Sequence, residues 1–446
     1  MADYNSSYAG AQIDSAVGTV LNGSKLLPAG GTAGQVLMKD SNSDYDVVWG
    51  DIDRTPVSIA VTTNPTKMTY EQLEEFDPTG MVVTCTFTDG GTRVLLNSTL
   101  TFNPSTFAST GSNTVTISAV VEGFTLTTTL TVTVTAITID SWAKAFQVGR
   151  SGVANQIMQV GDTINGTYTV GGSVYTCPWI VMDFRDAELE NGTIYHNAPI
   201  IQMHYTNHDN VAYDPAETTE ATEQTAQAGF YYVGYDGTNY TLLSLAAGDT
   251  IPYASYTTVY KTIYNSVNAV RYGDSEWQYS WMRQYLNHAA AGYAVKQHDC
   301  DVLPANALTT AGFMSYLESE MTSEMHQVKI STKQATYTGG SLIDTYDYFF
   351  PLSISEMNMK DNNASPDDGE PTPFYKQLLN SNTKVNVGTY AALIKYAVNG
   401  TTSAQNAWLR SAYLGSVYEW VVASSGNVNN GYPSDAIRVA PACFLV

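Results

Sequence analysis

The sequence is poor in charged residues, and the charges it has are mostly acidic. Asp, Glu, Lys and Arg together make up 14% of the 446 residues, against roughly a quarter in typical globular domains. Twenty basic residues against 42 acidic ones leave a formal net charge of −22. Because such a chain repels phosphate backbones and anionic lipids, we expect no nucleic-acid partner and no attraction to an acidic membrane.

Cysteines and long apolar runs are scarce as well. Cys85, Cys177, Cys300 and Cys443 are far apart and form no Cys-X-X-Cys pair, which argues against a disulfide framework or a zinc site. The first residues, MADYNSSYAGAQIDSAV, have neither a basic region nor an apolar core, so we expect no secretory signal. No run of about 18 apolar residues occurs, so we expect no membrane insertion. A cytosolic product that is released by lysis, such as a virion component, fits this combination.

Polar uncharged residues and tyrosine are plentiful. The chain has 31 Tyr and 34 Gly, and much of its polar character comes from Thr, Ser and Asn. This composition is typical of β-rich extracellular proteins and of binding surfaces. The length predicts two to four domains.

Residues 1–54 contain apolar side chains but are too few to bury them. Ile13, Val17, Val20 and Leu21 recur at helical spacing in the stretch from Ala11 to Leu21, and turn-forming glycines follow. A segment this short needs a partner surface, so we expect oligomerisation or docking; the alternative is a flexible tail. The stretch LPAGGTAGQVLMKDSNSDYDVVWGD resembles a module of tailed-phage fibre and collar proteins. That resemblance implies attachment to other virion proteins and a homotrimer.

Residues 55–136 predict a small all-β sandwich. Thr, Val, Ile and Phe alternate with period two in MVVTCTFTDGGTRVLL and in NTVTISAVVEGFTLTTTLTVTV. Asp89-Gly90-Gly91 is a hairpin signal, and Cys85 alternates with Val83 and Phe87, which predicts a buried, inert side chain. Over its whole length the segment resembles the bacterial immunoglobulin-like (Ig-like) domains of surface proteins and phage fibres, which implies a spacer.

Residues 137–446 predict an α+β domain with few helices and long loops. Ser141 is a helix N-cap candidate for the stretch that ends at Gly149, and Trp281, Met282, Tyr285 and Leu286 have helical spacing. The ordered motifs VRYGDSEWQYSWMRQYLN, DTYDYFFPLSISEM, AWLRSA and RVAPACF resemble a family of gut-phage and gut-bacterial proteins. That family has a C-type lectin fold of the formylglycine-generating-enzyme type. Many members are variable proteins of diversity-generating retroelements, in which adenine-encoded positions near the C-terminus are rewritten.

The segment Asn406–Phe444 combines stiff borders with a surface-like interior. Trp408 and Arg410 at one end and Arg438 near the other stand in apolar surroundings, which predicts buried scaffold. Between them Tyr, Ser, Asn and Gly dominate, as in an antibody paratope; an ordinary exposed hairpin is the alternative. We expect ligand contact from Tyr413, Tyr418, Trp420 and Tyr432 as aromatic anchors, and from Ala412, Leu414, Ser416, Glu419, Ser434 and Asp435 as rim or diversified positions.

Three groups of residues have the chemistry of a metal or catalytic site without a convincing pattern. His204, His208 and Asp209 lack an assured helical spacing. The loop Asp361–Pro371 offers hard oxygen donors, but a solvated acidic loop explains it equally. A formylglycine-generating oxidase needs two C-terminal cysteines, and only Cys443 follows Cys300. We therefore expect no catalytic residues, no cofactor and no metal.

These observations together predict a phage tail-fibre or receptor-binding protein located in the virion. Its C-terminal domain would recognise a glycan or protein on the host cell surface. Two alternatives stay open, a capsule-degrading spike enzyme and a decoration or collar protein without a role in adhesion.

Overall fold

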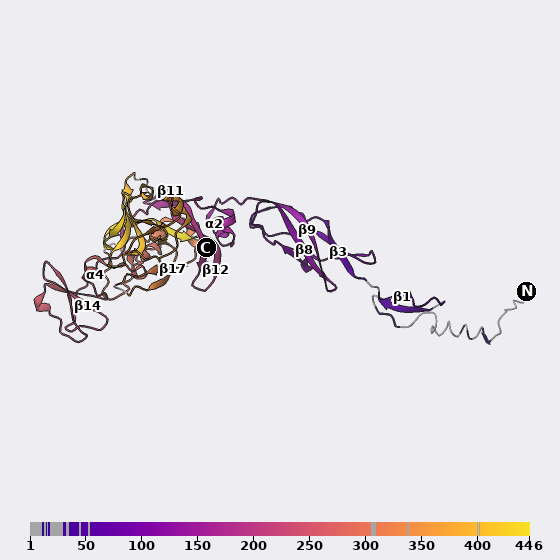
Figure 1. The fold of residues 1–446 in the computed structure, drawn as a ribbon, viewed down its shortest axis with the longest axis horizontal. Coiled ribbons are helices and arrows are strands. Elements are labelled where there is room, and N and C mark those ends of the chain that lie inside the picture. Colours follow the sequence, from indigo (N-terminus) through magenta and orange to yellow (C-terminus); the bar gives the residue numbers. More distant parts are fainter. Residues whose placement is uncertain are drawn as a thin grey trace, which may run out of the picture. The chain divides into compact units, whose positions relative to one another are not determined.

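The computed structural model describes residues 11–12, 15, 17, 30–32, 35–43, 46–51, 54–304, 309–336, 339–398, 400 and 402–446. They belong to two compact units, Met1–Thr135 and Ala136–Val446 (Figure 1). The architecture is mostly β, with several antiparallel sheets and few short helices. The unit boundary falls one residue before the predicted one. Of the predicted helix from Ala11 to Leu21, only residues 11, 12, 15 and 17 are described, and they are helical; the rest lies outside the described residues.

The first unit contains a hairpin and two further sheets. Strands β1 (Gln35–Lys39) and β2 (Val47–Asp51) pair antiparallel, with Leu37 opposite Trp49. One sheet has the order β3-β5-β6, formed by Pro56–Thr63, Val82–Phe87 and Thr92–Leu95. The other has the order β4-β9-β8-β7, formed by Thr69–Glu71, Phe124–Thr135, Gly111–Val121 and Leu100–Asn103.

An apolar core in this unit draws side chains from both of the larger sheets. Val83, Cys85 and Phe87 alternate into it from β5 and are almost fully buried, so the predicted inert role of Cys85 agrees with its position. Val115 and Val132 enter the core from the other sheet. The Asp89–Gly91 segment joins β5 to β6, with Thr86 opposite Thr92, and this confirms the predicted hairpin.

The second unit begins with a helix and a long hairpin. Helix α2 (Trp142–Gly149) starts as predicted, because the Ser141 hydroxyl accepts a hydrogen bond from the Lys144 amide at 3.3 Å. Strands β10 (Thr163–Val170) and β11 (Ser173–Glu188) follow, with Val170 opposite Ser173 across the turn. The sheet has the order β10-β11-β12-β28-β19, completed by Ile194–Met203, Pro441–Phe444 and Phe350–Pro351. The last strand of the chain, β28, therefore pairs on both edges.

The second large sheet carries most of the C-terminal segment. Its order is β13-β27-β24-β25-β26, formed by Val211–Ala212, Ala436–Val439, Ala407–Ala412, Glu419–Val422 and Val428–Gly431. Every residue of β24 and β25 is buried, so both faces of these two strands are covered. The turn Tyr413–Tyr418 leaves the sheet between them.

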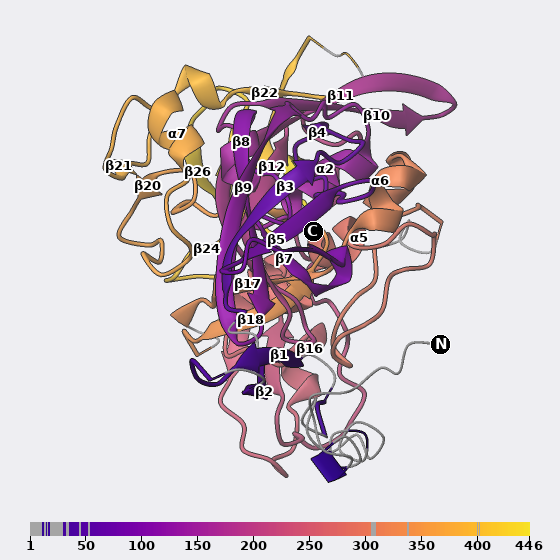
Figure 2. The same ribbon diagram turned by 90° about the vertical axis from the view of Figure 1, so that its right-hand side faces the viewer.

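The remaining elements of this unit are short (Figures 1 and 2). A three-stranded sheet has the order β15-β14-β16, from Tyr240–Leu243, Tyr231–Tyr235 and Thr258–Thr262. Three two-stranded pairs are β17 (Val328–Lys333) with β18 (Leu342–Asp347), β20 (Met359–Lys360) with β21 (Val385–Asn386), and β22 (Lys395–Tyr396) with β23 (Ala404–Gln405). The helices are α3 (Ala154–Ile157), α4 (Val267–Tyr272), α5 (Trp281–Leu286), α6 (Ser319–Glu324) and α7 (Pro373–Leu378). Within the described ranges, no helix is long and apolar enough to cross a membrane.

Candidate ligand-binding face

The first border of the C-terminal segment, with Trp408 and Arg410, is buried scaffold, as predicted, whereas Arg438 near the other border is half-buried. Trp408 is 1% exposed, and its indole donates a hydrogen bond to the Val211 carbonyl at 3.0 Å. Arg438 donates to the Asn207 carbonyl at 2.8 Å. The side chain of Trp408 thus links β24 directly to β13, two strands that β27 separates in the sheet.

Arg410 meets the carboxylate and the carbonyl acceptor that its burial demands. Its guanidinium pairs with Glu356 at 2.9 Å and donates to the Pro351 carbonyl at 2.8 Å and the Thr332 hydroxyl at 3.0 Å. Burial opposes ionisation of Glu356, yet the charges of Arg410 and Arg185 outweigh it and hold the pKa of Glu356 below its ordinary value. The buried ion pair is therefore fully formed at neutral pH.

The four predicted aromatic anchors lie together in one cluster. The ring centroids of Tyr413 and Trp420 are 5.3 Å apart, those of Tyr413 and Tyr418 are 6.1 Å apart, and those of Tyr418 and Tyr432 are 5.3 Å apart. The rings come from the β24–β25 turn, from β25 and from the residue after β26. Tyr432 is 41% exposed, Tyr413 and Tyr418 are half-buried, and Trp420 lies beneath them.

A fifth ring, Tyr272, belongs to this cluster and was not predicted from the sequence. It stacks on Tyr432 with a centroid separation of 4.0 Å and an interplanar angle of 19°. Tyr272 ends helix α4, and the exposed Arg271 beside it lies over the rings of both Tyr272 and Tyr240. Since α4 is far from the C-terminal segment in the sequence, no local pattern could have revealed this contact. We call Tyr272, Tyr413, Tyr418, Trp420 and Tyr432 the aromatic cluster.

Three of the predicted contact residues are buried, contrary to expectation. Ala412, Glu419 and Trp420 have exposed fractions of 2%, 0% and 3%. They belong to β24 and β25, two inner strands that are covered on both faces. Side chains of such strands do not alternate between a buried and an exposed face. In this conformation they support the surface and do not form part of it.

Burial changes the chemistry of Glu419. Desolvation raises the pKa of its carboxyl well above the ordinary value, and repulsion from Asp368 and Asp274 adds to the effect. One carboxylate oxygen accepts a hydrogen bond from the Trp420 amide at 3.1 Å. Glu419 is therefore a core residue whose burial favours the protonated form, and it has no exposed surface to offer a ligand.

The other predicted residues surround the cluster on turns. Leu414 and Ser416 are half-buried in the β24–β25 turn, where the Leu414 amide donates to the Asn363 carbonyl at 2.9 Å. The Ser434 amide donates to the Tyr272 carbonyl at 2.8 Å, which fixes the turn after Tyr432 against helix α4. Asp435 is exposed. The first bond fixes the β24–β25 turn against the loop that contains Asn363, and the second fixes the turn after Tyr432 against α4.

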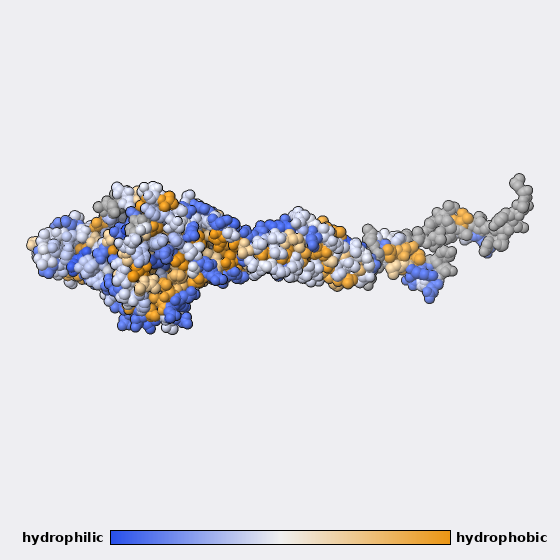
Figure 3. All heavy atoms as spheres, turned by 90° about the horizontal axis from the view of Figure 1, so that it is seen from above, coloured by the Kyte–Doolittle hydropathy of each residue, from blue (hydrophilic) through white to orange (hydrophobic). Residues whose placement is uncertain are grey.

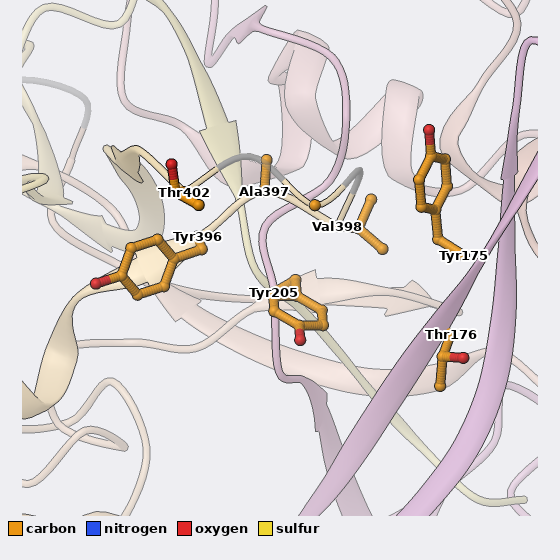
Figure 4. A pocket seen from close by; sticks show the side chains of 8 residues that line it. Tyr175, Thr176, Tyr205, Tyr396, Ala397, Val398 and Thr402 are labelled. Carbon is orange, nitrogen blue, oxygen red and sulfur yellow. The ribbon is translucent and has the colours of Figure 1, made fainter.

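The described residues of the same unit line several pockets. One of them, of about 580 Å³, contains none of the predicted residues. Figure 4 shows the rings of Tyr205 and Tyr396 beside the segment carrying Ala397, with Tyr175 on strand β11. Another pocket, of about 370 Å³, includes Ser434 with Asp209 and Trp281, so it adjoins the turn that follows Tyr432.

The metal candidates considered from the sequence do not converge. His208 pairs with Asp209 at 3.1 Å, but His204 is exposed and joins no cluster of ligand atoms within the part of the chain described. In the loop Asp361–Pro371, Asp361 caps Asn363, and the buried Asp368 accepts hydrogen bonds from Lys333 and Ser411. The carboxylates of Asp361 and Asp368 therefore already accept hydrogen bonds from the protein.

Part of the chain matches the model of a protein family. Residues 254–446 match the model of a family described as a domain of unknown function (DUF6273). The matched range begins before α4 and runs to the last residue, so it includes all five rings of the aromatic cluster. No curated protein matches the chain.

Proposed function

We propose that this protein is a phage virion adhesin that recognises a host surface ligand through the aromatic cluster. The single observation that carries the proposal is the convergence of Tyr272, Tyr418 and Tyr432, partly exposed on a frame of buried strands. Rings held in this way bury contact area at low conformational cost, which is why Tyr and Trp dominate binding hot spots.

The other parts of the proposal rest on sequence resemblance together with the coarse architecture. We propose that the two larger sheets of the first unit form an Ig-like spacer. We likewise propose that the second unit is a variant of the C-type lectin fold. In that reading Leu414, Ser416, Ser434 and Asp435 are positions at which variation alters the ligand while the buried frame persists. The ligand is a glycan or a protein of a gut bacterium.

The N-terminal segment would attach the protein to the virion and assemble it as a trimer. Its described hairpin exposes Val36, Met38 and Val48, at 38%, 44% and 40%. Figure 3 shows orange, apolar atoms on the surface of this hairpin. A short segment with such a surface gains stability by burying it against other chains.

The proposal is tested by measuring how labelled full-length protein binds to a panel of gut bacteria. Replacing Tyr432 or Tyr272 with Ala is expected to weaken binding by about 2 kcal/mol, roughly 30-fold, because each removes a ring from the cluster. The matched control is Tyr396→Ala, since Tyr396 is 42% exposed, as Tyr432 is at 41%, but lines the pocket of about 580 Å³ shown in Figure 4. Melting temperatures of all three variants should stay near that of the wild type.

Several results would contradict the proposal. Binding to none of the panel by the wild type would do so, and so would unchanged binding by Tyr432→Ala and Tyr272→Ala. Loss of binding in Tyr396→Ala alone would place the contact in the pocket of Figure 4. New reducing ends released from host capsule would instead support a spike enzyme. Undiminished adsorption by a phage lacking the gene would support a decoration protein.

A further inference from the structure

Three side chains from two separate loops of the second unit converge in its interior. Glu217 lies between β13 and β14, and Cys300 and Asp301 lie in the loop after α5. One ligand atom from each, a carboxylate oxygen or the thiol sulfur, falls within 4.8 Å of the others. Cys300 is fully buried, Glu217 is 2% exposed, and Asp301 is half-buried.

Glu217 has an oxygen for which the described part of the protein provides no partner. Its Oε2 accepts a hydrogen bond from the Thr262 hydroxyl, whereas the buried Oε1 accepts none. A buried carboxylate oxygen without a partner costs several times the net gain of a typical hydrogen bond. Asp301, by contrast, is held in place by the amides of Gln297 and His298, both at 2.7 Å.

The electrostatic surroundings of Glu217 favour a cation. Burial and the neighbouring charge of Asp274 raise the pKa of Glu217 well above its ordinary value. The pKa values of Asp214 and Asp274 are raised as well, in both cases first by burial. The next cause is the charge of Asp274 for Asp214 and the charge of Glu276 for Asp274. Among the described residues the only positive group paired with this set is His298, 3.4 Å from Asp301. A concentration of buried carboxyl groups with so little compensating charge is stable only if protons or a metal ion neutralise it.

We propose that Glu217, Cys300 and Asp301 bind a divalent cation of the zinc class. A thiolate with two carboxylate oxygens is a donor set that zinc accepts, and a water molecule would complete a tetrahedral site. On binding, the metal–sulfur bond replaces the S–H bond of Cys300, and the thiol proton leaves to solvent. The unpartnered oxygen of Glu217 becomes a ligand, and the positive charge compensates Asp274 and Asp214.

Such an ion would hold in place the segment that contacts helix α4, and α4 carries Tyr272 of the aromatic cluster. The Glu217 amide donates to the Ala269 carbonyl at 3.3 Å, and Ala269 belongs to α4, the helix that ends in Tyr272. The cation would therefore cross-link the loop of Cys300 to the segment on which α4 rests. This inference does not depend on the proposed function, because the bound metal is measured directly.

The test uses tag-free, full-length protein that has been stripped with a chelator and titrated with Zn²⁺ and with Co²⁺. We expect one equivalent of either metal, and for Co²⁺ the near-ultraviolet charge-transfer absorption of a thiolate ligand. Cys300→Ser should abolish that absorption and weaken Zn²⁺ binding at least about 10-fold. Glu217→Gln should weaken binding while the absorption persists at saturating Co²⁺. Cys177→Ser is the matched control, since Cys177 is equally buried and lies outside the cluster.

Absence of the charge-transfer absorption in the wild type at saturating Co²⁺ would overturn the proposal, whether or not a variant folds. Zn²⁺ binding that is unchanged in Cys300→Ser would overturn it as well. A wild type that binds no metal would mean that protons alone neutralise the carboxyl groups.

Discussion

Arg410 carries its charge in a place that is only 2% exposed, so its partners determine what it contributes. Glu356, the Pro351 carbonyl and the Thr332 hydroxyl surround the guanidinium. Removing the side chain would leave the carboxylate of Glu356, itself 5% exposed, with the Ser353 amide at 2.8 Å and, as its charged partner, only the more distant Arg185 at 3.5 Å.

Arg410→Ala is expected to lower the free energy of unfolding of the second unit by about 3–5 kcal/mol, the cost of an uncompensated buried charge. Denaturant unfolding measures the effect. Lys329→Ala is the control, because Lys329 forms ion pairs with Glu188 and Asp344 at the surface, where a pair contributes at most about 1 kcal/mol. Similar losses in the two variants would contradict a structural role for the buried pair.

Glu419 predicts an unusual dependence of stability on pH. Its folded-state pKa lies well above the ordinary value of 4.5, so between the two values the folded state holds more protons than the unfolded state. Stability must therefore fall as pH rises through that window. Asp368 and Asp274, whose pKa values are also raised by burial, act in the same direction.

We expect the melting temperature of the second unit to decrease from pH 5 to pH 8, and Glu419→Gln to reduce the decrease. The amide keeps the shape of the carboxylic acid and cannot ionise. Glu190→Gln serves as the control, since Glu190 is exposed. If the profiles of wild type and Glu419→Gln ran parallel, Glu419 would not be the group responsible.

Among the elements, helix α2 contacts the backbone of the chain end through Gly149. A Cβ atom added to Gly149 would lie 1.8 Å from the Leu445 carbonyl oxygen. Leu445 directly follows β28, whose pairing with β12 and β19 joins the end of the chain to the first sheet. The last turn of α2 thus packs directly on the backbone that follows the final strand.

Gly149→Ala should separate α2 from this backbone and cost about 1–3 kcal/mol of stability, the usual range for overpacking. Gly415→Ala is the matched control, because its Cβ would meet only Asn363, at 3.8 Å. Thermal unfolding of both variants measures the difference. Equal melting temperatures would show that the chain end moves aside without cost.

For the whole molecule, the exposed apolar side chains indicate where copies of the chain would associate. The hairpin β1–β2 has apolar side chains on its surface, whereas the larger sheets of the first unit enclose a core of their own. Association should therefore depend on the N-terminal segment.

Light scattering is expected to give the mass of a trimer for the full chain and a lower mass when residues 1–54 are removed. The triple variant Val36→Ser, Met38→Ser and Val48→Ser should have the same lower mass, because these substitutions remove the apolar surface of the hairpin. Val94→Ser with Leu96→Ser is the control, since both side chains are exposed, at 62% and 70%, but lie outside the hairpin. A monomeric full chain would contradict the prediction.

The sequence alone determined the features that depend on near neighbours in the chain. Alternation placed Cys85 in a core, Asp89-Gly90-Gly91 formed the expected turn, and Ser141 capped its helix. Trp408 and Arg410 were predictable as scaffold because a charge or a large ring in an apolar strand requires burial with partners. Each of these depends on a few adjacent residues.

Only the tertiary structure decided which side chains of the C-terminal segment face outward and what they meet. Glu419 and Trp420 are buried because β25 lies between two other strands and is covered on both faces, which no local alternation reveals. Tyr272 joins Tyr432, and Glu217 meets Cys300, through contacts between segments that are distant in sequence. Such contacts arise from how the sheets and loops pack, and the order of residues within one segment carries no record of them.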